Sequence, residues 1–225
     1  MKQTKPACRG YFLRRLLVYT VGLLILTMGV SLSVKSDLGI SPVNSFPYVV
    51  SRITESDQGF WTTLVFIVYV LVQILPLGRK FRPIQLTQVI AAIAFGAFVS
   101  LCNRLLAFPV PEQYLLRVAL MIAGIVCMSV GLFLYLATDL IPQPADGFCL
   151  VVQQKTGWQY GNIKCCMDCT MVALSALLSY LCTGSVIGVR EGTLLAMLTI
   201  GKLCGLFHKR FGRRVHVFCF GAETI

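Results

Sequence analysis

Apolar and polar positions divide the chain into long uncharged runs joined by short polar segments. Five runs of 19 to 21 residues contain no charged side chain, and a sixth run, at 192–207, is interrupted only by Lys202. A helix needs roughly 20 apolar residues to cross the hydrocarbon core of a bilayer. The pattern therefore predicts six transmembrane helices, at about 16–35, 58–78, 83–103, 118–138, 161–183 and 189–207.

The composition agrees with this pattern. Hydrophobic residues make up 56% of the 225 residues and charged residues only 13%, and the mean hydropathy is +0.77. A soluble domain of this length has no interior large enough for so much apolar surface, so lipid must cover much of it. We expect an all-α polytopic membrane protein whose first partner is the lipid bilayer.

The formal net charge of +11 follows the expected topology and does not indicate a nucleic-acid partner. With the N-terminus placed in the cytoplasm, 15 of the 20 Lys and Arg residues fall on the cytoplasmic side of the six spans. Cytoplasmic loops of membrane proteins carry such an excess. We therefore expect an N-in, C-in protein with basic cytoplasmic tails at 1–14 and 209–225.

The chain also repeats itself after 102 positions. Six of the 15 residues at 36–50 are identical to their partners in the second copy, and three inserted residues later raise the shift to 105. We interpret this self-similarity as an internal duplication, with repeats at 16–106 and 115–208. The aligned pairs include Gly22/Gly124, Gly29/Gly131, Asp37/Asp139, Pro42/Pro144, Asn44/Asp146, Phe46/Phe148, Gly59/Gly161, Ala91/Ala196 and Gly96/Gly201.

Each repeat contains three predicted spans. Because an odd number of crossings reverses the direction of the chain, the second repeat must enter the membrane upside down relative to the first. Such inverted-topology repeats are typical of transporters, which bind their substrates near the interface of the two repeats. The sequence thus predicts a 3+3 inverted-topology repeat.

A short broken segment follows the first span of each repeat. The segments read DLGISPVNSFPYVV from Asp37 and DLIPQPADGFCLVV from Asp139. Their prolines interrupt a helix, and non-helical backbone is tolerated at membrane depth only where it faces protein or a water-filled cavity. We expect short helices at 45–53 and 147–154. The sequence leaves open whether these enter the membrane as half-length helices or lie on its surface as interfacial amphipathic helices.

From about Arg14 to His208 the chain resembles the YczE/YyaS/YitT group of bacterial integral membrane proteins, most closely its YczE-type branch. The resemblance is carried by Leu38–Pro42, by Pro144–Gly147 and by Thr156–Trp158. Asn44 stands where the family pattern has an aspartate, so a mechanism that needs a carboxylate in both repeats does not fit this chain. The resemblance implies a multi-pass protein of the bacterial cytoplasmic membrane and names no substrate.

The broken segments supply the candidate substrate-binding residues. Asp146 is the strongest of these, because a carboxylate in such a break can bind a cation, a proton or an amine, although it can equally serve as a helix cap. The hydroxyl and amide groups of the same segments can contribute, and so can the aspartates at the preceding helix ends. The full candidate set is Asp146, Asn44, Ser41, Gln143, Ser45, Asp37 and Asp139.

Other polar groups have simpler structural interpretations. Lys164 and Asp168 are four residues apart on one predicted helix, a spacing that allows them to pair and neutralise each other. Glycine pairs at 184/188 and 201/205 predict close helix packing, either within the bundle or in a homo-oligomer. Trp61, Trp158 and Tyr160 are expected to anchor the chain at the membrane interface.

The sequence predicts neither an enzyme nor a cofactor or metal site. Both histidines, His208 and His216, lie at or beyond the end of the last span, and no phosphate-binding or paired-histidine motif is present. The cluster Cys165, Cys166 and Cys169 lacks a second group of ligands.

These observations favour a secondary transporter or channel for a small polar or charged solute, with a site between the two repeats. Two alternatives remain at this stage. One is a membrane scaffold or regulatory protein that does not transport, and the other is a substrate-binding membrane subunit of a larger importer.

Overall fold

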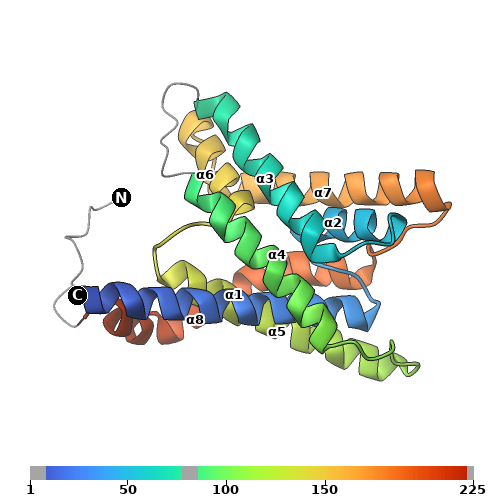
Figure 1. The fold of residues 1–225 in the computed structure, drawn as a ribbon, viewed down its shortest axis with the longest axis horizontal. Coiled ribbons are helices and arrows are strands. Elements are labelled where there is room, and N and C mark those ends of the chain that lie inside the picture. Colours follow the sequence, from blue (N-terminus) through green and yellow to red (C-terminus); the bar gives the residue numbers. More distant parts are fainter. Residues whose placement is uncertain (1–8, 78–85, 222–225) are drawn as a thin grey trace.

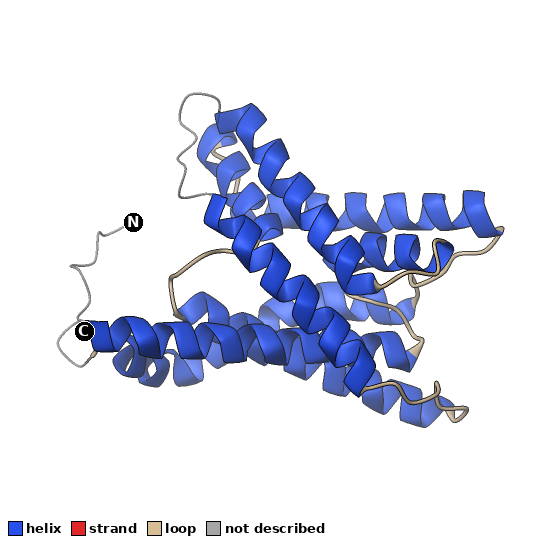
Figure 2. Ribbon diagram, viewed as in Figure 1, coloured by secondary structure: helices blue, strands red, loops and turns tan. Residues whose placement is uncertain are grey.

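The structure is a computed structural model that describes residues 9–77 and 86–221, and its regular elements are all helices (Figures 1 and 2). The helices follow one another through short loops. Their bounds are α1 Arg9–Ser36, α2 Pro42–Ile53, α3 Gln58–Leu77, α4 Thr87–Leu105, α5 Tyr114–Ala137, α6 Pro144–Thr156, α7 Tyr160–Thr183 and α8 Glu191–Phe220.

The two broken segments fold alike. Within two residues of the end of the preceding helix lies an aspartate with a left-handed backbone, Asp37 with φ 52° and Asp139 with φ 46°. Each following helix then begins at a proline, Pro42 or Pro144. Proline suits this first position because its missing N–H has no intrahelical partner there anyway. The results are the short helices α2 and α6, of 12 and 13 residues.

The central contact of the molecule is between α1 and α5, which run antiparallel. Gly22 lies against Gly131, and Gly29 lies against Gly124. A Cβ atom on Gly29 would stand 2.6 Å from the carbonyl oxygen of Gly124 and from the amide nitrogen of Met128. Glycine at these points lets the two backbones approach, as in many membrane helix pairs.

The eight helices form two groups of four. In the first, the α1–α5 group, α4 packs on α1 and α8 packs on α5. In the second, the α2–α6 group, α2 contacts α7, α7 contacts α6, α6 contacts α3 and α3 contacts α2. The main contact between the groups is that of α3 with α4, which cross the molecule together in Figure 1.

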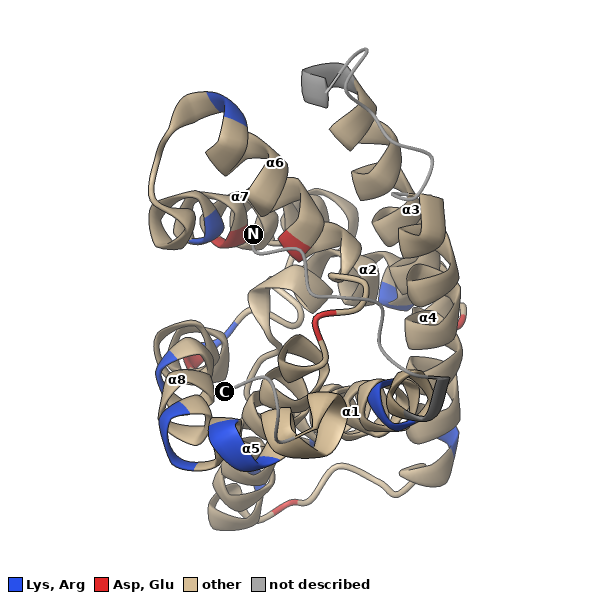
Figure 3. Cartoon of the chain, turned by 90° about the vertical axis from the view of Figure 1, so that its left-hand side faces the viewer, with Lys and Arg blue, Asp and Glu red and all other residues tan. Residues whose placement is uncertain are grey.

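Much of the outer surface is apolar. Within the described residues, four helices are long and apolar enough to cross a membrane, namely α1, α4, α5 and α7, and α3 is apolar over the shorter stretch Gln58–Ile74. Large hydrophobic side chains are exposed on most of the helices, and charged positions are sparse along the ribbon in Figure 3. Contact with lipid explains such a surface, because soluble proteins rarely expose large continuous apolar patches to water. The fold is that of a helical membrane protein.

The last helix continues beyond its predicted end at residue 207, so that the stretch predicted as a basic tail from 209 is helical through Phe220. Charged residues end an apolar span, but they do not end a helix, because Lys and Arg are good helix formers. The added turns of α8 return to the start of α1, where the Arg15 guanidinium lies 4.6 Å from the centre of the Phe220 ring. The tail predicted at 1–14 includes residues 1–8, which lie outside the described residues, as do 222–225 of the second tail.

Candidate functional site

The first turns of α2 and α6 face one cavity of about 340 Å³ between the two helix groups. Ser41 and Gln143 occupy the N-cap positions of these helices, and neither makes a side-chain capping bond. Asn44 and Asp146 lie one turn further in, at matching places. The four strongest candidates from the sequence are therefore brought together, although they come from segments about 100 positions apart.

The remaining cavity wall has one apolar and one charged side. The charged side comes from α7, which contributes Lys164 and Asp168. Apolar side chains from the α1–α5 group cover the opposite side. They include Leu26, Val30, Met128, Leu132, Leu136, Met197 and Ile200.

Asp146 is held by three side chains from two other helices. The hydroxyl of Tyr135 donates to one carboxylate oxygen, and the hydroxyl of Tyr160 donates to the other at 3.1 Å. The ammonium of Lys164 lies 3.4 Å from that second oxygen and 3.5 Å from a carboxylate oxygen of Asp168. These contacts fix the carboxylate at the cavity wall.

Asp146, Lys164 and Asp168 form a buried acid–base–acid cluster. Only 12% of each Asp side chain and 27% of the Lys side chain are exposed. With all three groups ionised the cluster carries one uncompensated negative charge. Such a charge is costly in a poorly hydrated interior, and charged groups inside membranes are mostly paired or functional.

Several buried polar atoms of the cavity have no hydrogen-bond partner among the described residues. They include Oδ1 of Asn44 and Nε2 of Gln143, whereas Oδ1 of Asp168 has only its 3.5 Å ion pair with Lys164. The Asn44 amide uses only its nitrogen, which donates to the hydroxyl of Ser41 at 2.9 Å. Most buried polar groups in proteins are hydrogen-bonded, and an unpaired one costs about 1–3 kcal/mol. The cavity thus offers one free acceptor, Oδ1 of Asn44, and one free donor, Nε2 of Gln143, to a bound molecule.

Three of the seven candidates lie outside the cavity. The Ser45 hydroxyl bonds the Ser175 hydroxyl at 2.8 Å, which ties α2 to α7. Asp37 is exposed at its helix end and pairs with Arg117 at 3.3 Å and with Arg190 at 3.8 Å. Asp139 is also exposed and offers its backbone carbonyl to Arg15. Their left-handed backbone suits Asp and Asn, so turn geometry accounts for both aspartates.

Sequence reasoning missed part of the polar wall. It assigned Tyr160 to the membrane interface and limited Lys164 to a pair with Asp168, whereas both contact Asp146. It did not single out Tyr135, whose repeat partner is Ser33 and therefore gives no signal. The place of Lys164 in the site could have been predicted, because the acid four residues after it and its position near a broken segment are both visible in the sequence.

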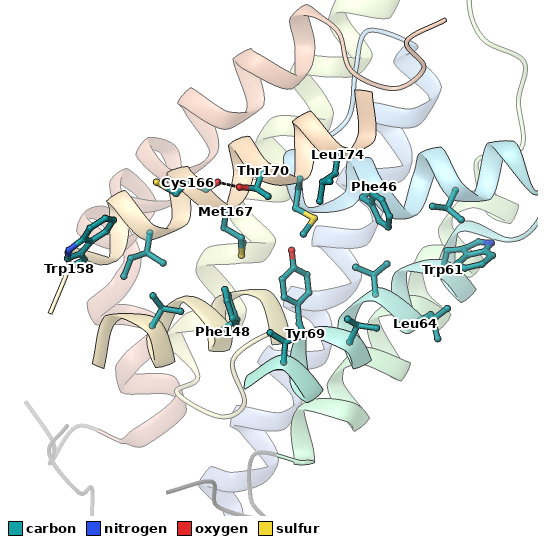
Figure 4. A pocket seen from close by; sticks show the side chains of 17 residues that line it. Phe46, Trp61, Leu64, Tyr69, Phe148, Trp158, Cys166, Met167, Thr170 and Leu174 are labelled. Carbon is teal, nitrogen blue, oxygen red and sulfur yellow. Dashed lines mark hydrogen bonds between the residues drawn. The ribbon is translucent and has the colours of Figure 1, made fainter. Parts of the chain in front are cut away.

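A larger groove of about 710 Å³ lies between α2, α3, α6 and α7, and Figure 4 shows its side chains. Its lining is almost wholly apolar, with Phe46 and Phe148 on α2 and α6 and with Leu64 and Leu174 on α3 and α7. The Tyr69 side chain projects into the groove (Figure 4). We place the candidate site in the smaller cavity, because buried polar groups converge there and not in this groove.

The structure gives no support for a metal site at the cysteines. Cys165, Cys166 and Cys169 are exposed and free on α7. No group of three His, Cys, Asp or Glu side chains within 9–77 and 86–221 is close enough to hold a metal ion.

Comparison with known proteins gives a family and two relatives. The model of DUF6198, described as a family of unknown function, matches residues 13–209. The uncharacterized membrane protein YczE of Bacillus subtilis (strain 168) is 27% identical over 155 residues, which cover 68% of this chain and 70% of YczE. The uncharacterized protein YyaS of the same organism is 27% identical over 148 residues, which cover 60% of this chain and 66% of YyaS. No solved structure matches the chain.

Proposed function

The chain belongs to the DUF6198 family, and we propose that this membrane protein is a carrier for a small solute with a cationic group, bound in the cavity beside Asp146. One observation carries the proposal. A buried cluster of two carboxylates and one ammonium lines the same cavity as unpartnered polar atoms. A purely structural cavity gains nothing from such groups, because each unpaired polar atom lowers stability.

The substrate class follows from the chemistry of the wall. The spare negative charge of the Asp146–Lys164–Asp168 cluster attracts a cation, such as a protonated amine. Oδ1 of Asn44 accepts a hydrogen bond, and Nε2 of Gln143 donates one. The apolar wall favours a solute that also has a hydrocarbon part. A small amine with an apolar body satisfies all three surfaces.

We further propose that the fold is a 3+3 inverted repeat that spans the membrane six times, through α1, α3, α4, α5, α7 and α8. In this arrangement α2 and α6 are half-length helices. Twelve residues extend about 18 Å, which is too short for a hydrocarbon core of about 30 Å. Their N-terminal turns then meet near the middle of the membrane, where transporters of this kind hold their substrates.

Contacts that convert into one another when each residue is exchanged for its repeat partner, 102 positions away, support the inverted repeat. The contact of Gly22 with Gly131 becomes the contact of Gly124 with Gly29 when each residue is exchanged for its repeat partner. In the same way the pair of Arg15 with Asp139 becomes the pair of Arg117 with Asp37. Exchanges of this kind are expected of a two-fold axis that relates antiparallel halves.

The proposed topology places both termini in the cytoplasm, as the distribution of Lys and Arg predicts. The start of α7, with Tyr160 and Lys164, is then near the cytoplasmic side. In this topology the cavity lies on that side of the membrane, because Tyr160 and Lys164 of α7 and Cys204 of α8 line it. We therefore propose that the structure is an inward-facing state.

Binding is the experiment that tests the proposed site. The purified protein would be screened for thermal stabilisation by small amines, cations, neutral amides and carboxylates. A ligand at a hundredfold excess over its Kd stabilises the folded state by about 2.7 kcal/mol. We expect amines with an apolar body to raise the Tm of the wild type, and expect this rise to disappear in Asp146→Asn.

Asp139→Asn is the matched control, because it removes the same charge at the repeat partner of Asp37, outside the cavity. Asparagine also tolerates the left-handed backbone at this position. Equal stabilisation of the wild type and Asp139→Asn, with none in Asp146→Asn, supports the site. Equal stabilisation of all three proteins, or none in any of them across the panel, contradicts it and favours a scaffold.

A further inference from the structure

The largest difference in packing between the two halves of the molecule is in one helix contact. In the first half α3 packs closely on α4. The corresponding helices of the second half are α7 and α8, and within the described residues these two are not a packed pair. Figures 1 and 3 show α3 beside α4, whereas α7 and α8 lie apart. Apart from the smaller contact of α1 with α8, which has no counterpart between α5 and α4, the other helix contacts have a counterpart in the opposite half.

The contact between α3 and α4 is tight and specific. A Cβ atom on Gly59 would collide with the carbonyl oxygen of Gly96. At the same end the hydroxyl of Ser100 donates to Asp57 at 2.5 Å, and the Asn103 amide donates to Gln58 at 2.9 Å. Deeper in the molecule, Phe66 and Phe95 stack with their ring centres 5.3 Å apart.

The same glycines occur in the second half without a partner helix against them. Gly161 is the repeat partner of Gly59, and Gly201 is the repeat partner of Gly96. Both are exposed, and among the described residues nothing lies within 4 Å of a Cβ atom built on either one. Glycine costs an isolated helix about 1 kcal/mol relative to alanine, so an open helix face has no use for it.

The cavity occupies the place of the missing contact. Its residues Asp168, Ile200 and Cys204 correspond to Phe66, Phe95 and Val99 of the packed half, which are fully or almost fully buried. The first half is therefore what the second half becomes when its two helices close. The second half is what the first becomes when its helices separate.

We infer that the protein has a second state in which α7 packs on α8 through Gly161 and Gly201, while α3 separates from α4 at Gly59 and Gly96. The inference rests on the proposed function, because it describes how the site beside Asp146 changes sides. The α2–α6 group rocks against the α1–α5 group. The cavity closes on the α7–α8 side and opens on the α3–α4 side, where the hydrogen bonds of Ser100 and Asn103 are among those that now hold the two helices together.

Two pairs of spin labels measure the two sides. One pair sits at Asn162 and Leu206, and the other sits at their repeat partners, Phe60 and Leu101, all four of which are exposed. Because the chain has ten cysteines, the labels are attached to a ketone-bearing unnatural amino acid. The distances between the two labels of each pair are measured by double electron–electron resonance spectroscopy on the protein in lipid nanodiscs. In a carrier with these two states, the labels of one pair are far apart whenever the labels of the other pair are close together.

Gly161→Leu is the test variant, since it fills the inferred contact and leaves the cavity lining unchanged. We expect its Tm to be equal to or above that of the wild type, because leucine is the better helix former. The population of molecules with a short distance between the labels at Asn162 and Leu206 must disappear. Leu198→Trp is the matched control, because Leu198 and its repeat partner Ile93 are both exposed and lie outside either contact.

Two opposite variants loosen the packed side. Gly59→Leu forces α3 from α4, and Ser100→Ala with Asn103→Ala removes two hydrogen bonds without a clash, which covers the case in which Gly59→Leu does not fold. Either change must lengthen the Phe60–Leu101 distance and shorten the Asn162–Leu206 distance. Unchanged distances in the double variant and in Gly161→Leu overturn the inference. Because binding is measured separately, an Asp146-dependent ligand with unchanged distances retains the site and rejects only the second state.

Discussion

At the scale of single residues, one position in each repeat shows how local chemistry makes the two halves different. Asn44 and Asp146 occupy the same turn of α2 and α6. Asp146 meets an ammonium and two hydroxyl groups, whereas the Asn44 amide meets only the Ser41 hydroxyl. The repeat partners of Lys164 and Asp168 are Thr62 and Phe66, so the charged wall belongs to the second half alone.

Lys164 holds this wall together, because it neutralises one of the two acids that flank it. We expect Lys164→Met to lower the free energy of unfolding by about 3 kcal/mol, since it leaves two buried carboxylates facing each other. The measurement is the Tm and the denaturation midpoint of the purified variant. Adding Asp168→Asn to Lys164→Met should recover most of the loss.

Lys155→Met is the control for the loss of a positive charge, because Lys155 is exposed at the end of α6. Its stability should stay within about 0.5 kcal/mol of the wild type, as for most surface substitutions. If Lys164→Met is as stable as Lys155→Met, the cluster is not coupled in the way that its distances indicate.

At the scale of helices, glycines mark where backbones meet and where they do not. Gly29 lies against α5, whereas Gly205 on α8 has nothing within 4 Å of a built Cβ atom among the described residues. Alanine should therefore have opposite effects at the two positions. Gly29→Ala should destabilise the protein by about 1–3 kcal/mol through overpacking, and Gly205→Ala should stabilise it by about 0.5–1 kcal/mol.

Thermal unfolding of the two alanine variants beside the wild type provides the measurement. Helix propensity alone favours alanine at both positions, so a loss at Gly29 isolates the effect of the contact. A higher Tm in Gly29→Ala would mean that α1 and α5 are not in contact at this glycine.

The two short helices were predictable, although they begin at residues 42 and 144 and not at the predicted 45 and 147, because a proline occupies the first position of each helix instead of lying in the break before it. The end of α8 was not predictable. Pro42 and Pro144 are visible in the sequence as residues that interrupt a helix, and the two prolines align with each other in the repeat. The turns of α8 beyond 207 depend on contacts with α1, such as that of Arg15 with Phe220. Hydropathy indicates whether a helix lies in lipid or in water, and it does not predict tertiary contacts of this kind.

At the scale of the whole molecule, the self-similarity of the sequence predicted that residues of the two broken segments would meet. Charge and packing then give these residues different surroundings in the two halves. Ser41, Asn44, Gln143 and Asp146 reach one cavity, as expected for segments related by the repeat. The grouping of helices was not predictable, because each group of four takes two helices from each half. Nor could the sequence show that one glycine contact is closed and its counterpart open, since both halves carry the same glycines.

The most direct measurement of the central claim is uptake by the protein reconstituted into liposomes, with the amine that gives the largest Asp146-dependent rise in Tm. We predict saturable uptake by the wild type and by Asp139→Asn, and uptake at the level of empty liposomes for Asp146→Asn. An amine that binds at Asp146 but is never moved by the wild type would contradict a carrier. Uptake that Asp146→Asn retains in full would contradict the site.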